Sequence, residues 1–109
     1  MIEGIPDSSL VIVNLVNPKE KFWGALRSLT PVGLTILAIN LDSFEDWVRQ
    51  LTREEEQNLD LVTMFVPLFR VERIFLDEPV GAVSSYSQRF EAIVGVRPEK
   101  YLGLAGPDA

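Results

Sequence analysis

The chain has 109 residues, of which 47% are apolar and 24% charged, a composition typical of one folded globular domain and unlike that of a disordered or low-complexity chain. Sixteen acidic residues against ten basic ones give a net charge of −6, which argues against nucleic acid and against an anionic membrane surface as partners. The absence of cysteine and histidine excludes disulfides and zinc–thiolate sites, and it removes the commonest general base.

The first three predicted elements are β-strands. Residues 10–16 are apolar and largely β-branched, which indicates a strand. Residues 22–29 alternate between two faces, and Gly24 among them is typical of the bend or bulge that a small barrel needs. A turn with proline and glycine at residues 30–33 leads into a third strand at residues 34–41, so the second and third strands are predicted to form a hairpin.

A helical insertion is predicted at about residues 42–58, between the third and fourth strands. An Asp-Ser pair at its start can cap it, and an apolar stripe follows at i, i+3, i+4 and i+7. The stripe consists of Phe44, Trp47, Val48 and Leu51. Two further strands are predicted at residues 61–66 and 70–77. Residues 84–103 then carry two short helices, the first ended by a glycine and the second begun by a proline.

In this order the elements predict a mostly β, α+β single domain over residues 1–109. Five short strands within residues 10–77 are typical of a small and strongly bent barrel. The two C-terminal helices at residues 84–103 cover either their own barrel or that of a neighbouring subunit.

Two segments of the strand block carry a family resemblance. Phe22-Trp23-Gly24-Ala25-Leu26 has the pattern aromatic-x-Gly-x-Leu, and residues 66–74 combine an apolar strand, a break and a short final strand. Together they resemble the two motifs of the Sm-like small-barrel family over roughly residues 10–77. The resemblance implies a five-stranded Sm-like barrel, and rings in which strand four of one subunit joins strand five of the next.

The chain departs from that family where the family binds RNA. Thr30 stands at the family's aspartate, Gly33 at its base-contacting asparagine, and Pro67-Leu68 at its Arg-Gly pair. The resemblance therefore implies assembly more than RNA binding, and Pro67 limits the pairing of strand four because it has no N–H. The chain as a whole also resembles small bacterial proteins that share a Phe-Trp-Gly strand and a Ser-Phe-x-x-Trp helix, to which no activity is attached.

Aromatic and basic side chains form the candidate interaction surface. Phe22 and Trp23 are neighbours on a strand and point to opposite faces, so one of them leaves the barrel core, and the same holds for Ile74 and Phe75. Helices of the same chain or a second subunit can cover such residues, and core packing is the alternative for both tryptophans. The candidate surface consists of Trp23, Trp47, Phe69, Arg70, Arg73 and Phe75.

Three groups of charged residues each have a functional and a structural interpretation. The carboxylates Asp42, Glu45 and Asp46 lie within one helical turn and suit either Ca²⁺ or Mg²⁺ or, more simply, helix capping. The run Glu54-Glu55-Glu56 is typical of a solvated segment, with a cation site as the alternative. The third group is Arg27, Arg70 and Arg73, which suit an anion site or pairing with Glu20, Glu72 or Asp77.

No pattern in the sequence indicates catalysis. A Gly-x-Ser-x-Gly turn and glycine-rich phosphate loops are both absent, so we expect no catalytic residue, cofactor or metal. No apolar run approaches the ~18 residues of a membrane span, and the first seven residues do not resemble a signal peptide, so we expect a cytosolic protein.

The sequence predicts a non-enzymatic protein-interaction module that associates with itself and, in a further option, with another protein. An RNA-binding Sm-like protein and a small-ligand-binding domain are the alternatives.

Overall fold

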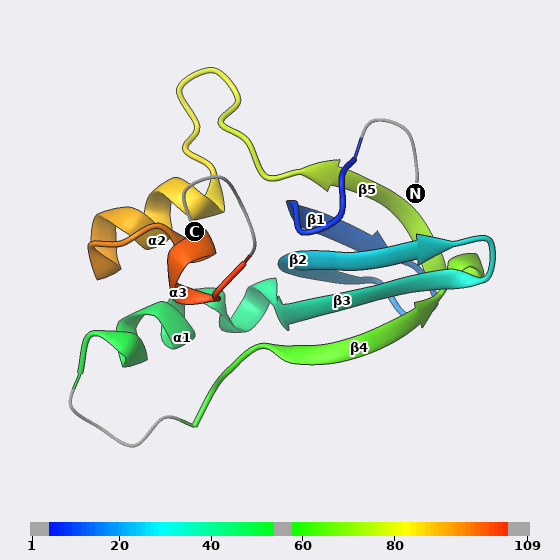
Figure 1. Cartoon of the computed structure of the whole chain (residues 1–109), viewed down its shortest axis with the longest axis horizontal. Helices are drawn as coiled ribbons and strands as arrows, with labels where there is room; N and C mark the ends of the chain where they lie inside the picture. The colour runs from blue at the N-terminus through cyan, green and yellow to red at the C-terminus, as the bar shows by residue number, and fades with distance from the viewer. Residues whose placement is uncertain (1–4, 54–57, 105–109) are drawn as a thin grey trace.

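The computed structural model describes residues 5–53 and 58–104, and its main element is a five-stranded antiparallel sheet in the order β4-β3-β2-β1-β5 (Figure 1). The strands are β1 (Leu10–Leu15), β2 (Glu20–Thr30), β3 (Gly33–Asn40), β4 (Val62–Pro67) and β5 (Val71–Leu76). The helices are α1 (Phe44–Leu51), α2 (Tyr86–Val94) and α3 (Pro98–Tyr101), with 3-10 turns η1 (Leu41–Ser43) and η2 (Leu68–Arg70). The predicted α+β class, with five strands, a helix between the third and fourth strands and two short helices at the end, is confirmed.

The two edge strands of the sheet follow each other directly in the chain. In a flat sheet β4 and β5 would lie about 19 Å apart, four strand spacings. The connecting turn η2 has only three residues and advances about 6 Å. The sheet must therefore curl until its two edges approach at that end, as Figure 1 shows on the right. The sheet nevertheless remains open, because β4 pairs only with β3 and β5 only with β1 within the described chain. The expected closed barrel is therefore not confirmed.

The inner face of the curled sheet holds a core built by strands. All five strands contribute to it, for example Val11 of β1, Leu26 of β2, Ile36 of β3 and Val66 of β4, each at most 6% exposed, and Ile74 of β5 packs against them. This face needs no helix because the sheet covers itself.

The outer face is covered by helices at one end. Trp23 of β2 packs against Phe44 and Trp47 of α1, with ring centroids 5.2 and 5.9 Å apart, and Phe90 of α2 packs on Trp47 at 5.3 Å. Leu104, which follows α3, lies in the same core cluster. The C-terminal helices therefore cover the sheet of their own chain, which answers the alternative that the sequence left open.

Glycine plays a different part in β2 from the one expected. The bulge in β2 lies between Leu26 and Ser28, not at Gly24. A Cβ atom at Gly24 would overlap the backbone of Leu37 and Ala38, so the glycine allows β3 to approach closely.

Asp77 joins the sheet to the helical layer. One of its carboxylate oxygens accepts hydrogen bonds from Trp23 Nε1 (2.9 Å), from the Ser87 amide (2.8 Å) and from Ser87 Oγ (2.7 Å), and the other accepts from the Tyr86 amide (2.9 Å). These amides are free donors at the first turn of α2, which suits a carboxylate. Ser85 and Gln88 complete this helix start with a capping box.

A second polar link connects the helices to each other. Arg89 of α2 forms an ion pair with Glu45 of α1, and its guanidinium lies 5.1 Å from the ring centre of Tyr86. The side-chain cap expected from Asp42 and Ser43 is not formed at α1. Asn40 instead caps the preceding turn η1, and its Oδ1 accepts from the Asp42 amide at 2.8 Å. None of the helices in the described ranges has the length and apolar character of a membrane span.

Replacing Asp77 by alanine is expected to lower the free energy of unfolding by about 3 kcal/mol, because four donors lose an anionic acceptor. Urea denaturation measures this loss. Glu78→Ala, at the exposed neighbouring position, is the matched control and should change stability by less than ~0.5 kcal/mol. Equal losses in the two variants would contradict the role given to Asp77.

Candidate functional site

The two tryptophans of the predicted interaction surface lie in the core. Trp23 and Trp47 are both 0% exposed, at the centre of the aromatic cluster between sheet and helices. Their burial matches the core alternative and removes them from any surface that a partner can reach.

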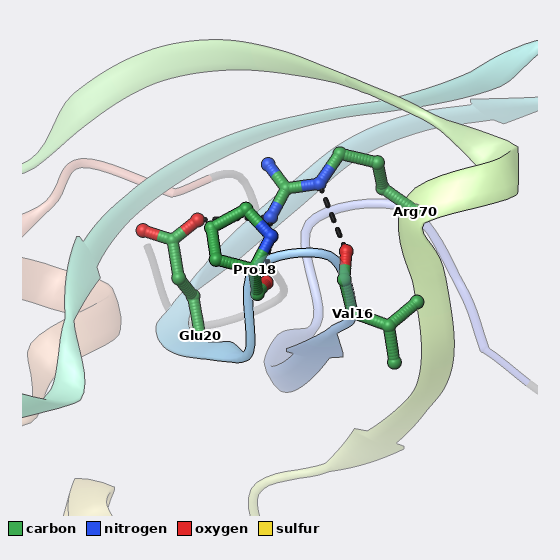
Figure 2. Close-up of polar contacts among 4 residues, drawn as sticks. All are labelled: Val16, Pro18, Glu20 and Arg70. Carbon is green, nitrogen blue, oxygen red and sulfur yellow. Dashed lines mark hydrogen bonds and ion pairs between the residues drawn. The ribbon is translucent and has the colours of Figure 1, made fainter.

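Arg70 of the predicted surface is engaged in holding two loops together (Figure 2). Its Nε donates to the Val16 carbonyl at 3.1 Å, and its Nη2 donates to the Pro18 carbonyl at 2.8 Å and to Glu20 Oε1 at 3.0 Å. The backbone adds a bond from the Val16 amide to the Arg70 carbonyl at 2.8 Å. The fork of one guanidinium thus ties η2 to the turn between β1 and β2, and the pairing with Glu20 is one that the sequence offered as the alternative to an anion site.

The three arginines proposed for an anion site are not brought together in one chain. Arg27 lies in the β2 bulge, just past the pairing of Ala25 with the first residue of β1, whereas Arg70 contacts the chain just after the last residue of β1. Six residues of strand separate these points, about 20 Å. Arg73 has a 65% exposed side chain and approaches Glu72 at 3.7 Å.

The proposed acidic cation site is also not assembled. Glu45 is paired with Arg89, and Asp42 lies in η1 outside α1. No group of three potential metal ligands occurs in the described ranges 5–53 and 58–104. The run Glu54-Glu55-Glu56 lies outside the described residues.

An exposed apolar surface surrounds the edge strand β4. Phe69 is 84% exposed and Phe65 56% exposed. We define the β4 surface as Val32, Val62, Phe65, Leu68 and Phe69. The backbone bond from Leu68 to Val32 (2.9 Å) joins η2 to the β2–β3 turn, and the Phe65 ring lies against Gly33, where a Cβ atom would clash with it. Turn, strand and η2 therefore lie together at this edge, with Phe65 on the outer face of the sheet and Val62 on the inner face, beside Met64 and Val66.

The opposite edge of the sheet borders an apolar groove. Phe75 of β5 is 41% exposed and lines a groove of about 530 Å³ together with Ile12 and Tyr86. Val80 and Val83 form the other wall and are bridged to each other by backbone hydrogen bonds of 3.0 and 2.9 Å. Their loop projects away from the sheet in Figure 1.

A second depression, beside the start of β2, is polar. Basic and acidic side chains line it in equal number: Lys19, Lys21 and Arg73 are basic, and Glu20, Asp42 and Glu72 are acidic. Neither sign dominates, so the depression does not select an anion or a cation.

Comparison with known proteins leaves the geometry as the only guide to function. No family model matches the chain, no curated protein matches it, and no solved structure matches it.

The sequence analysis selected Phe69 and Phe75. It missed Val62 and Phe65 on β4, Leu68 in η2 and Val32 in the turn between β2 and β3. A signal was present in the sequence, because residues 61–69 form an uninterrupted uncharged run between Asp60 and Arg70. The run predicts a strand with Pro67 at its end or at an edge, but it does not show that the β2–β3 turn and η2 bring Val32 and Leu68 beside that strand.

Replacing Arg70 by methionine keeps the aliphatic stem and removes three donated hydrogen bonds. The expected loss is about 1–2 kcal/mol in the free energy of unfolding, discounted because the side chain is partly exposed. Arg73→Met is the matched control and should stay within ~0.5 kcal/mol. Thermal or urea unfolding checks both, and an unchanged Arg70→Met variant would contradict a clamping role.

Proposed function

We propose that the chain is a non-enzymatic protein-interaction module that assembles into homo-oligomers through the edges of its sheet. The observation that carries the proposal is the state of β4 and β5. Each pairs with a neighbour on one side only within the described chain, and each exposes a phenylalanine, Phe65 at 56% and Phe75 at 41%. An unpaired strand with exposed apolar side chains offers another chain both backbone hydrogen bonds and buried area.

The Sm-like interpretation is the finer form of this proposal. The family's rings require strands four and five to be the two free edges, and the order β4-β3-β2-β1-β5 has them there. The strong curl and the strand-only inner core also support it. The long insertion carrying α1 and the missing RNA-binding motif set the chain apart, so self-association at a sheet edge, and not the ring itself, is the part of the resemblance that we retain.

A small-ligand-binding domain is the second candidate, and the groove beside Phe75 favours it. A volume of about 530 Å³ and an apolar lining match those of pockets for small molecules. The groove is open, however, and one of its walls is a projecting loop, so it suits a macromolecular contact at least equally well. The described part of the chain does not bring the candidate arginines into one basic cluster that would favour the RNA alternative, since Arg27 and Arg70 lie at opposite ends of β1.

We also propose that the protein works in the cytosol. A cysteine-free, acidic interaction module suits the cytosol, where disulfides play no structural part.

Light scattering behind a sizing column is expected to show a discrete oligomer at low and moderate salt, with a mass that is stable over a range of loading concentrations. The double variant Phe65→Lys/Phe75→Lys places one charge on each edge and should run as a folded monomer, because a lysine facing a neighbouring strand opposes edge pairing. A wild-type monomer at every concentration would reject the assembly function and leave the groove as the feature to test for ligands.

A further inference from the structure

We infer that the assembly is a two-fold dimer in which β4 of one copy pairs antiparallel with β4 of a second copy, with Phe65 at the symmetry axis. The inference rests on the proposed function for the statement that the chain assembles with itself. It adds which edge joins, how many copies join and which residues face each other.

Charge distinguishes the two edges. β5 carries the exposed residues Glu72 and Arg73, and charged side chains on an edge strand oppose pairing with another chain. β4 carries no charge at all, and residues 61–69 around it are uncharged. Its single protective feature is Pro67, at the last residue of the strand, which leaves the preceding N–H groups available. β4 is therefore the unprotected edge.

The net charge of the chain favours the same surface. Two copies that each carry −6 repel one another, so their contact is most favourable where neither side brings a charge. Pairing β4 with β4 buries no ionised group on either partner. Pairing β4 with β5 places Glu72 and Arg73 beside an apolar strand that offers them no partner, which costs desolvation energy.

The area of the β4 surface matches one standard interface. Phe65 and Phe69 together expose about 280 Å² if a phenylalanine side chain has ~200 Å² to bury. Val32, Val62 and Leu68 raise the exposed apolar area, counted over both faces of the edge, to about 450 Å², with ~100 Å² taken for each fully exposed aliphatic side chain. A standard protein interface buries about 800 Å² on each partner, of which roughly 450 Å² is apolar. The exposed apolar area of the β4 surface is thus about the apolar area that one partner buries in a standard interface, so a second copy can cover it.

The helices of the described chain leave the β4 side of the outer face exposed, which leaves room for the second copy. The helices cover the outer face near Trp23, at the left of the sheet in Figure 1, whereas β4 forms the lower border of the sheet. Thr63 and Phe65 on the outer face of β4 are exposed, while Met64 and Val66 turn toward the inner core.

The pleat of the strand limits the register. Residues directly opposite each other in an antiparallel pair lie on the same face of the joined sheet. Phe65 lies on the outer face and Met64 on the inner face, so a residue cannot lie opposite its neighbour in sequence. A two-fold axis normal to the sheet must therefore place one residue opposite its own copy, with the axis between the two. With the axis at Phe65, the two phenylalanine rings form an aromatic cross-strand pair and Pro67 faces Thr63 at the end of the ladder.

Symmetry makes the dimer distinguishable from a ring. A contact of β4 with β4 is isologous and closes at two copies, whereas a contact of β4 with β5 is heterologous and continues into a ring or filament. The number of copies therefore reports which edges pair.

The main experiment compares one lysine on each edge strand, with mass measured by light scattering over a dilution series. The wild type should be a dimer, and Phe65→Lys should raise its dissociation constant at least ~30-fold, the effect of losing one hot-spot residue. Phe75→Lys is the matched control on β5 and should leave the dimer unchanged. Phe69→Lys, at the most exposed member of the β4 surface, should weaken the dimer without disturbing the fold, and far-UV circular dichroism checks that each variant is folded.

The register has its own test in this cysteine-free chain. Phe65→Cys should give a disulfide-linked dimer on mild oxidation, because the two positions lie opposite each other at the axis. Thr63→Cys is the matched control on the same face, and its two copies lie about 13 Å apart in this register, too far for a disulfide. Cross-linking at position 63 but not at 65 would overturn the register.

The possible failures are separable. A ring of more than two copies, or dissociation by Phe75→Lys as well as by Phe65→Lys, would overturn the β4–β4 dimer and retain the proposed assembly function. A dimer insensitive to both Phe65→Lys and Phe69→Lys would do the same, since it would use another surface. A wild-type monomer throughout the dilution series would overturn both proposals.

Discussion

The three-residue connection between β4 and β5 is the constraint on which the rest of the structure depends. These strands are the opposite edges of the sheet, and η2 is too short to cross a flat sheet of five strands. The sheet therefore curls, and its inner face closes over a core made by strands alone. The outer face then becomes convex and needs another cover, which α1, α2 and α3 supply over the half that contains Trp23.

Two polar residues hold this arrangement at its two ends. Arg70 fastens the β4–β5 corner to the turn after β1, and Asp77 fastens the end of β5 to the start of α2 and to Trp23. Each is an ionised side chain with several partners, the kind of polar contact that contributes most to stability when it is partly shielded from water. The sequence offers Arg70 for an anion site, and in the fold it holds two loops together. The proposal of an interaction surface therefore rests on the exposed apolar side chains at the sheet edges.

The two edges differ in a way that bears on assembly. β5 is protected by charged residues and accompanied by a groove and a projecting loop, whereas β4 carries no charge and has no helix or loop over it among residues 5–53 and 58–104. Natural sheets usually protect such an edge, because an unpaired apolar strand invites other chains to pair with it. An edge left this open is more simply explained as an interface than as a free surface, which is why we propose self-association.

Local pattern determined the elements, and long-range contacts determined their roles. Alternation over residues 22–29, the Pro-Gly turn and the stripe from Phe44 to Leu51 were enough to predict the hairpin and the helix, because each signal lies within one element. Alternation also showed that Phe22 and Trp23 face opposite sides, but not that α1 and α2 cover the side of Trp23. The partners of Arg70, and Trp23 as a partner of Asp77, lie about fifty residues away in the chain, so no local pattern indicated them. The gathering of Val32, Phe65 and Phe69 around the edge strand β4 was likewise decided only by the tertiary structure, since a strand's sequence states which residues share a face and not which turns lie beside it.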